Sequence, residues 1–191
     1  VTAPVEVWSL ANITAMLDSA LVTNDDDHVM TTINAIARAF ENVGSQRQEA
    51  MGVIIDSLAT STGILDTQPD GVQKMALVVS TILSYGNETL DSANINKTVA
   101  VMDQTLALAK ADTLAQGTGS INDQSGTAFL ESIMALNPSA QTGIRSTLTS
   151  AGEKEISAKV SSLVSGLGSA GILAMPVNGS MTLTAAGPNS T

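Results

Sequence analysis

The side chains best suited to chemistry are few, and they gather in one acidic segment early in the chain. His28 is the only histidine, it directly follows Asp25, Asp26 and Asp27, and the chain contains no cysteine. Such residues could supply part of a Ser-His-Asp triad or an oxygen-rich calcium site. Aspartates at the start of a helix more commonly cap its backbone and complement its dipole. The sequence favours this capping role over catalysis.

Calcium is the metal that the acidic segments could bind. The candidate ligands are Asp25, Asp26, Asp27, Asp66 and Asp70. An EF-hand loop needs glycine at its sixth position and a bidentate glutamate at its twelfth. Counting from Asp25 or from Asp66 puts Ile36 or Leu77 at position twelve, so neither segment is an EF-hand. An irregular calcium site is the alternative to solvated turn and cap residues.

The remaining polar patterns do not indicate catalysis or a cofactor. The segment 117–120, Gly-Thr-Gly-Ser, lacks the lysine of a phosphate-binding P-loop and a preceding strand. Glu153 and Glu155 are two residues apart, so on a helix they would not face each other. We therefore expect a protein that is not an enzyme and that carries no cofactor, because catalysis needs convergent titratable groups.

Charge excludes two classes of partner. The formal net charge is −10, and the eight lysines and arginines are spread singly along 191 residues. Nucleic acids and anionic membrane surfaces both select clustered cations, which this chain lacks. No run of eighteen apolar residues occurs, so we expect no segment inserted in a membrane.

Five Asn-X-Ser/Thr sequons point toward the secretory route. The acceptor residues are Asn12, Asn87, Asn96, Asn178 and Asn189. This is a modest excess over the two or three expected by chance at this content of serine and threonine. The chain begins Val1-Thr2-Ala3-Pro4, which we interpret as the interior of a longer protein. The expected localisation is extracellular or cell-surface, with N-glycans attached.

Hydrophobic periodicity predicts a mainly α fold of about six to eight short amphipathic helices. Ser45 with Gln48 is interpreted as a capping box, Gly44, Gly63 and Gly86 as helix ends, and residues 116–125 as a loop. The expected helices cover residues 4–22, 27–44, 45–63, 69–86 and 95–115, then a short helix around Phe129–Met134 and a stretch at 139–167 that is one bent helix or two.

The pattern changes after residue 168. Residues 172–177 and 180–185 alternate apolar and polar side chains on either side of Asn178-Gly179, which is the pattern of a β-hairpin. A lone hairpin is marginal in water, so we expect further strands. The predicted organisation is a helical bundle at 1–168 and, at 169–191, the start of a β-subdomain that this chain leaves incomplete.

The order of helices followed by strands resembles the GAIN-type region of receptor-type polycystins, the polycystin-1 and sperm egg-jelly-receptor family. The resemblance covers roughly residues 10–186 and is one of pattern rather than of an invariant motif. It is carried by residues 33–40, 47–58 and 79–109, and by the exit from 160–167 through Met175-Pro176-Val177 into 181–183.

The resemblance implies a first GAIN subdomain made of helices, followed by a β-sandwich that begins with the hairpin. In that family the sandwich ends in a self-cleavage tripeptide of the His-Leu-Thr kind. Here His28 is followed by Val29 and no such tripeptide occurs, so no functional residue is transferred. The resemblance implies an ectodomain module near adjacent domains of the same polypeptide, other protein partners or a polycystin-type channel subunit.

Three functions are compatible with the sequence. The first is a non-catalytic extracellular module of a large cell-surface or matrix protein that positions neighbouring domains and partners. The second is a structural subunit of an extracellular filament or coat, which large exposed apolar patches would favour. The third is a cytoplasmic scaffold of α-helical repeats, which the helix pairs at 27–62 and 69–115 allow although no repeated sequence supports it.

Overall fold

The computed structural model describes residues 9–23, 25–39, 47–65, 70–86, 90–116, 121–138 and 148–174. This part of the chain contains seven α-helices, which confirms the prediction of a mainly helical fold. Their bounds are α1 Leu10–Val22, α2 Asp26–Arg38, α3 Arg47–Leu65, α4 Gly71–Gly86, α5 Ser92–Gln116, α6 Asp123–Leu136 and α8 Ser150–Ala174. None of these helices is both long enough and apolar enough to cross a bilayer.

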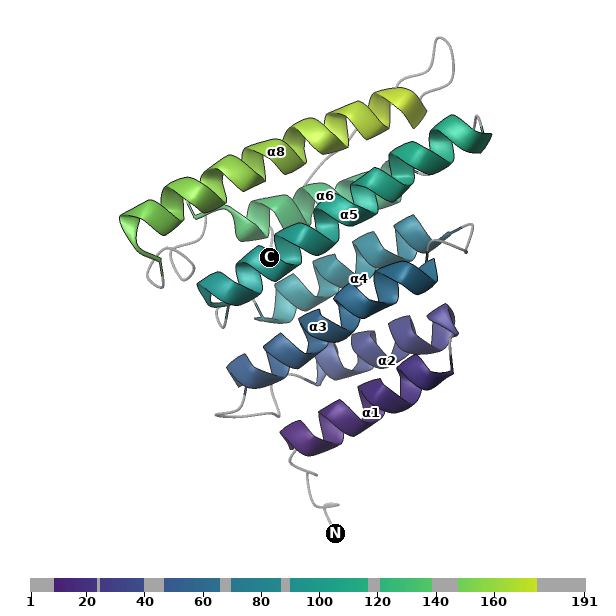
Figure 1. Cartoon of the computed structure of the whole chain (residues 1–191), viewed down its shortest axis with the longest axis vertical. Helices are drawn as coiled ribbons and strands as arrows, with labels where there is room; N and C mark the ends of the chain where they lie inside the picture. The colour runs from purple at the N-terminus through teal and green to yellow at the C-terminus, as the bar shows by residue number, and fades with distance from the viewer. Residues whose placement is uncertain are drawn as a thin grey trace.

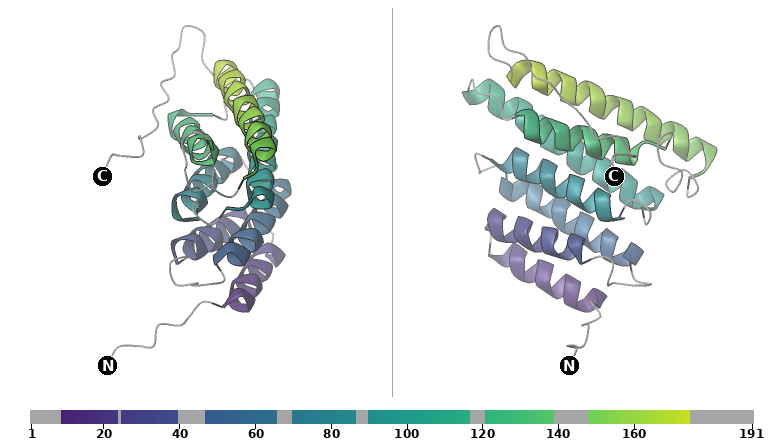
Figure 2. Two further views of the ribbon diagram at one scale, coloured as in Figure 1. Left: turned by 90° about the vertical axis from the view of Figure 1, so that its left-hand side faces the viewer. Right: turned by 180° about the vertical axis from the view of Figure 1, so that it is seen from behind.

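The helices form two stacked layers (Figures 1 and 2). Helices α1, α3, α5 and α8 follow one another in the first layer, and α2, α4 and α6 in the second. Most helices also pack against the next helix along the chain. The resulting helical hairpins stack on one another. This arrangement is the one used by stacked helical-repeat proteins, in which each hairpin covers the apolar face of its neighbour.

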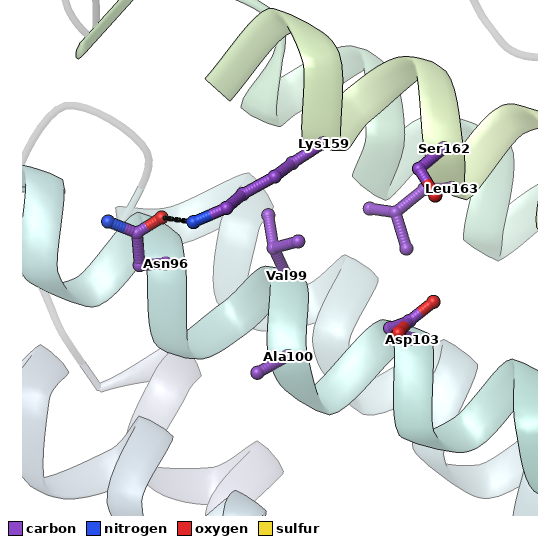
Figure 3. A pocket seen from close by; sticks show the side chains of 7 residues that line it. All are labelled: Asn96, Val99, Ala100, Asp103, Lys159, Ser162 and Leu163. Atoms are coloured by element: carbon purple, nitrogen blue, oxygen red, sulfur yellow. Dashed lines mark hydrogen bonds between the residues drawn. The ribbon is translucent and has the colours of Figure 1, made fainter. Parts of the chain in front are cut away.

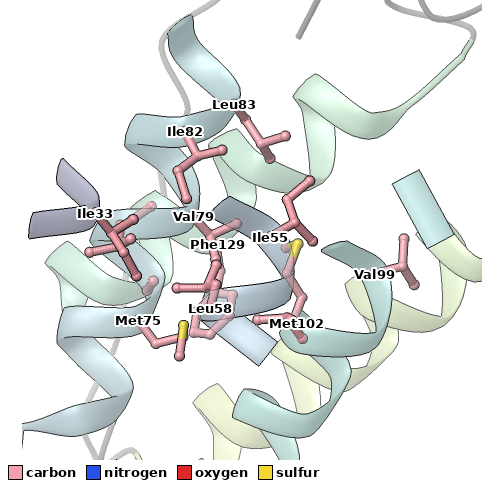
Figure 4. Close-up of a cluster of buried hydrophobic side chains, with 14 of the residues drawn as sticks. Ile33, Ile55, Leu58, Met75, Val79, Ile82, Leu83, Val99, Met102 and Phe129 are labelled. Atoms are coloured by element: carbon pink, nitrogen blue, oxygen red, sulfur yellow. The ribbon is translucent and has the colours of Figure 1, made fainter. Parts of the chain in front are cut away.

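One continuous hydrophobic core lies between the layers. It is aliphatic, and Phe129 of α6 is the only aromatic side chain among the buried residues that the structure describes. Phe129 is fully buried, in the same cluster as Met75 and Val79 of α4 and Leu58 of α3 (Figure 4). Burial of apolar side chains is the main term that holds such an array together, at about 25 cal/mol per Å² removed from water.

Small polar residues fill the core where helices approach closely. Thr98, Thr105 and Thr113 of α5 are buried, and each hydroxyl donates to the carbonyl four residues earlier. Ser61 of α3 and Ser132 of α6 do the same. These hydroxyl groups are therefore satisfied within their own helices, so they can be buried at little cost.

Polar bridges close the surface of most contacts within a layer. Lys74 joins α4 to α2 through Asp27, at 2.6 Å between Nζ and Oδ1. Lys97 joins α5 to α3 through Asp56, also at 2.6 Å. Lys159 of α8 donates to Asn96 Oδ1 of α5 at 2.6 Å. Single bridges of this kind contribute little energy at a surface, but together they fix the register of adjacent helices.

Several predicted boundaries differ from the structure. Gly63 does not end α3, which continues to Leu65. The helix predicted around Phe129 begins earlier, at Asp123, because Asn122 and Ser125 form a reciprocal capping box inside the predicted loop. Gly86 does end α4, as predicted.

Of the predicted capping box at Ser45 and Gln48, the structure describes Gln48 alone. The Gln48 amide donates to Asp91 Oδ2 of another helix start at 2.9 Å. Ser45 lies outside the described residues, as do residues 1–8 and 40–44 of the first two predicted helices.

The C-terminal region departs from the expected hairpin at its beginning. Helix α8 includes Ile172, Leu173 and Ala174, so the first three residues of the predicted strand are helical. The preceding segment is rich in glycine and serine, which are poor helix formers, so the packing of α8 on α5 and α6 is what favours helix past residue 168. The rest of the hairpin, from Met175 on, lies outside the described residues.

Candidate functional site

The acidic segment around His28 has a structural role. Asp25 caps α2, with its carboxylate accepting a hydrogen bond from the His28 backbone N–H at 3.3 Å. The predicted capping interpretation is thereby confirmed for Asp25. His28 itself is exposed on the first turn of the helix.

Two of the weak calcium candidates meet in space around a lysine. Asp27 of α2 and Asp70, next to the start of α4, both contact Lys74 Nζ, at 2.6 and 3.0 Å. The ammonium group thus occupies the position between the carboxylates that a cation would need. Asp66 and the side chain of Asp26 are outside the described residues. Within the described ranges, no group of three or more acidic, histidine or cysteine side chains converges as metal ligands do.

A cleft lies between α5 and α8 on the outer side of the first layer (Figure 3). It has a volume of about 230 Å³. The lining residues are Asn96, Val99, Ala100, Asp103, Lys159, Ser162 and Leu163. Four of them come from about two turns of α5 and three from about one turn of α8, so the cleft follows the seam between the two helices.

The floor of the cleft is apolar and its two ends are polar. Val99 and Leu163 are 7% and 1% exposed, and both point into the seam. Asn96 and Lys159 lie at one end, and Asp103 and Ser162 lie toward the other (Figure 3). A site of this form can hold a short hydrocarbon stem whose polar tip reaches one of the ends.

At the first end, the polar groups already satisfy one another. Lys159 Nζ donates to Asn96 Oδ1 at 2.6 Å and to Glu155 Oε1 at 2.7 Å. Its charge is therefore compensated by an ion pair one turn away on its own helix. This end of the cleft is a bridge between α5 and α8.

At the second end, the polar groups have no partners in the part of the chain that the structure describes. The Asp103 carboxylate is exposed and makes no ion pair or hydrogen bond there. The Ser162 hydroxyl is also unbonded, although Ser161, Ser165 and Ser169 of the same helix each donate to a carbonyl four residues back. A carboxylate and a hydroxyl that make no bond to the described residues thus lie beside an apolar floor.

The sequence did not single out Asp103 or Ser162, because each is an isolated polar residue in an amphipathic helix. A signal was present in the spacing. Residues 96, 99, 100 and 103 follow the three- and four-residue steps of one helical face. That face carries an amide, two small apolar side chains and a carboxylate. The sequence does not show that α8 packs beside this face. The pattern therefore cannot be distinguished from that of an ordinary solvated helix face.

The two sequons that lie in the described residues differ in their surroundings. Asn12 is exposed on α1, whereas Asn96 is half-buried and bonded to Lys159. Thr98, which completes the second sequon, is only 1% exposed. Asn87, Asn178 and Asn189 lie outside the described residues. The folded structure therefore leaves Asn12 accessible and uses the Asn96 side chain in an interhelical contact.

Among the described carboxylates, Asp91 has a shifted pKa. The pKa of Asp91 lies below its ordinary value, mainly because the backbone N–H of Asn94 donates to Asp91 Oδ1 at 2.8 Å. Desolvation acts in the opposite direction and raises the pKa. The hydrogen bond from the Gln48 amide lowers it further. Asp91 is thus the residue that caps α5 and connects its start to α3. Its environment stabilises the ionised form for a structural purpose.

Comparison with known protein families, curated proteins and solved structures finds no match to this chain.

Proposed function

We propose that this chain is a non-catalytic interaction and spacing module. The observation that carries the proposal is the continuous two-layer stack, in which one core joins seven described helices and polar bridges close the seams. Such an array is suited to holding its two ends at a fixed separation, because each helix is packed on neighbours along the stack. Its surface is then available for contacts with other proteins.

The module is proposed to work outside the cell, within a larger cell-surface or matrix protein. The five sequons support this location, and Asn12 offers an exposed acceptor on α1. The partners are adjacent domains of the same polypeptide and other proteins. By its resemblance to the polycystin region, a polycystin-type channel subunit is one such partner, and the β-subdomain would follow the helices.

A cytoplasmic helical-repeat scaffold is the second candidate, and the layered stacking of hairpins favours it. The filament reading is less favoured. In the described part of the chain, only Met16, Val22, Leu114 and Val164 are large exposed apolar residues, and they are spread over three helices. Single exposed apolar side chains are normal on a monomer, so they do not indicate a packing surface between copies.

Glycan occupancy tests the location. Protein from its native source is treated with N-glycosidase in heavy-oxygen water, and the resulting peptides are analysed by mass spectrometry. We expect label at Asn12, with little at Asn96 because that side chain holds Lys159. If Asn12 and the other four sequons all carry no label in native material, the support for secretion is lost. The cytoplasmic scaffold is then favoured.

A further inference from the structure

We infer that the cleft between α5 and α8 receives an arginine side chain from a basic segment of a partner protein. This inference rests on the proposed role as an interaction module and assigns a contact site and a partner chemistry to it. The juxtaposition that carries it is the Asp103 carboxylate and the Ser162 hydroxyl, which have no bonding partner among the described residues, at one end of an apolar floor.

The volume of the cleft decides the size of its occupant. Sites that enclose a whole small-molecule ligand usually measure about 300–1,000 Å³. At about 230 Å³ and open to solvent, this cleft is smaller. A single long side chain is a better match, and side chains that insert into such recesses are the usual anchors of protein interfaces.

The charge of the cleft and of the whole chain favours a cation. The Asp103 carboxylate can accept hydrogen bonds from a cationic donor group, and the Ser162 hydroxyl can accept one more from the same group. A guanidinium group presents several donors in a plane and can bind a carboxylate through two parallel bonds. The net charge of −10 also steers basic segments toward this protein.

The floor of the cleft matches the rest of an arginine side chain. Its methylene groups would lie on Val99 and Leu163, which are nearly buried already. Because Val99 and Leu163 expose so little, the contact mainly removes the arginine's own methylene surface from water while its charged tip stays at the rim. Ala100, exposed at the edge of the cleft, has a side chain too short to block the entry of a partner backbone.

An anionic occupant is disfavoured because Lys159 is engaged. Its ammonium group is held between the oxygens of Asn96 and Glu155. An acidic ligand would have to compete with Glu155 for that charge. Asn96 and Asp103 are seven residues apart on α5, about 10 Å along the helix axis at 1.5 Å per residue. The Asp103 end of the cleft is therefore about two helical turns along α5 from the Lys159 bridge.

The test measures binding of a terminally blocked Ala-Arg-Ala tripeptide to the full chain by ¹H–¹⁵N NMR titration. Matched peptides carry Gln or Glu in place of Arg. We expect saturable shifts at residues 99–103 and 162–163 with the arginine peptide, and weaker ones with the other two. The Asp103→Asn variant should weaken arginine binding about fivefold, the upper range for an exposed ion pair.

The control variant is Glu131→Gln, which changes the charge equally at the seam between α4 and α6. Glu131 is half-buried and accepts from Ser80 Oγ at 3.2 Å. Its substitution should leave arginine binding unchanged. Equal weakening by both variants would mean general attraction to an acidic protein and would overturn the inference. Preferential binding of the glutamate peptide, or no shift in the cleft with the arginine peptide, would overturn it too. The glycan result is independent of all these outcomes, so the two proposals can fail separately.

Discussion

The seam between α4 and α6 and the seam between α5 and α8 are equivalent positions in the two layers, yet they end differently at the surface. At α4–α6, Gln73 donates to Gln124 at 2.9 Å and accepts from Asn122 at 3.0 Å. Ser80 and Glu131 close the same seam about two turns further on. At α5–α8, one bridge involving Lys159 is followed by an open cleft with Asp103 at its far end.

The polar side chains at the surface of the α4–α6 seam bond to one another across it, whereas two of those that line the α5–α8 cleft make no bond to the described residues. Phe129 supplies bulk beneath the α4–α6 seam, and the polar groups above it bond to one another. The α5–α8 seam is lined by Ala100, Val99 and Leu163, and Gly166 lies against Leu106 further along. Ala100 and Gly166 are small, so they leave the outer edge of this seam unfilled. The unpartnered acceptor is then available to another molecule.

Truncating the largest core side chain should have the largest effect. We expect Phe129→Ala to lower the free energy of unfolding by about 3–5 kcal/mol, because it leaves a cavity under the α4–α6 seam. Chemical denaturation monitored by circular dichroism measures this. Val164→Ala, at a side chain that is 50% exposed, should change stability by less than about 0.5 kcal/mol. A loss below about 1 kcal/mol for Phe129→Ala would contradict the described core.

Removing the cap of α5 should cost about 1 kcal/mol. The variant is Asp91→Ala, which loses the bonds to Asn94 N–H and to the Gln48 amide. The folded pKa of Asp91 lies below its ordinary value of 3.8, so the unfolded chain binds the proton more readily. Its stabilisation is present above that value and is lost as the pH falls through the folded pKa.

Denaturation curves of the wild type and Asp91→Ala at neutral and strongly acidic pH check this prediction. The difference between the two proteins should shrink in acid. An Asp18→Ala variant serves as a control, since Asp18 is exposed within α1 and caps nothing. A difference that grows as the pH falls would reverse the expected sign.

Two glycines in α8 provide a matched pair at the α5–α8 seam. A Cβ on Gly168 would meet no atom within 4 Å, whereas one on Gly166 would lie 3.3 Å from Leu106 Cδ1. Alanine is favoured over glycine within a helix by about 0.8–1.0 kcal/mol, so Gly168→Ala should stabilise the fold by nearly this amount. Gly166→Ala should stabilise it less, because the Leu106 side chain must move. Equal gains in denaturation midpoints would show that the helices are less closely packed.

Filling the cleft should make the α5–α8 seam resemble the α4–α6 seam. We expect Ala100→Leu to change stability by less than about 0.5 kcal/mol, since Ala100 is exposed. The larger side chain should cover the floor and abolish the NMR response to the arginine tripeptide. Ala107→Leu is the control, because Ala107 is exposed on the same helix outside the cleft. Retained binding in Ala100→Leu would place the arginine elsewhere.

The sequence was sufficient to predict the helices but not their partners. Apolar residues repeat every three or four positions, which located most of the helices, and the proline after Asn137 marked the end of α6. The start of α6 was missed because Asn122 and Ser125 sit among loop-forming residues. The reciprocal capping box is visible only in the folded backbone. Gly63 was taken for a helix end, yet α3 continues to Leu65 in spite of the low helix propensity of glycine.

The strand expected from Ile172 shows the limit of short patterns. The first residues of the predicted strand are apolar, a composition that fits a helix as well as a strand, and the structure places Ile172–Ala174 in α8. The candidate site depended on tertiary packing. Asp103 and Ser162 are 59 positions apart in the sequence and become neighbours only when α8 packs on α5. No local pattern contains that information.

The position that an arginine side chain takes on this protein tests the proposed α5–α8 site most directly. Intermolecular nuclear Overhauser effects between the methylene protons of the blocked Ala-Arg-Ala tripeptide and methyl groups of the full chain would locate it. We predict contacts to the methyl groups of Val99 and Leu163, in the cleft between α5 and α8. Contacts only to methyl groups at the α4–α6 seam, such as those of Leu77 or Leu130, would contradict the assignment of the α5–α8 cleft as the interaction site.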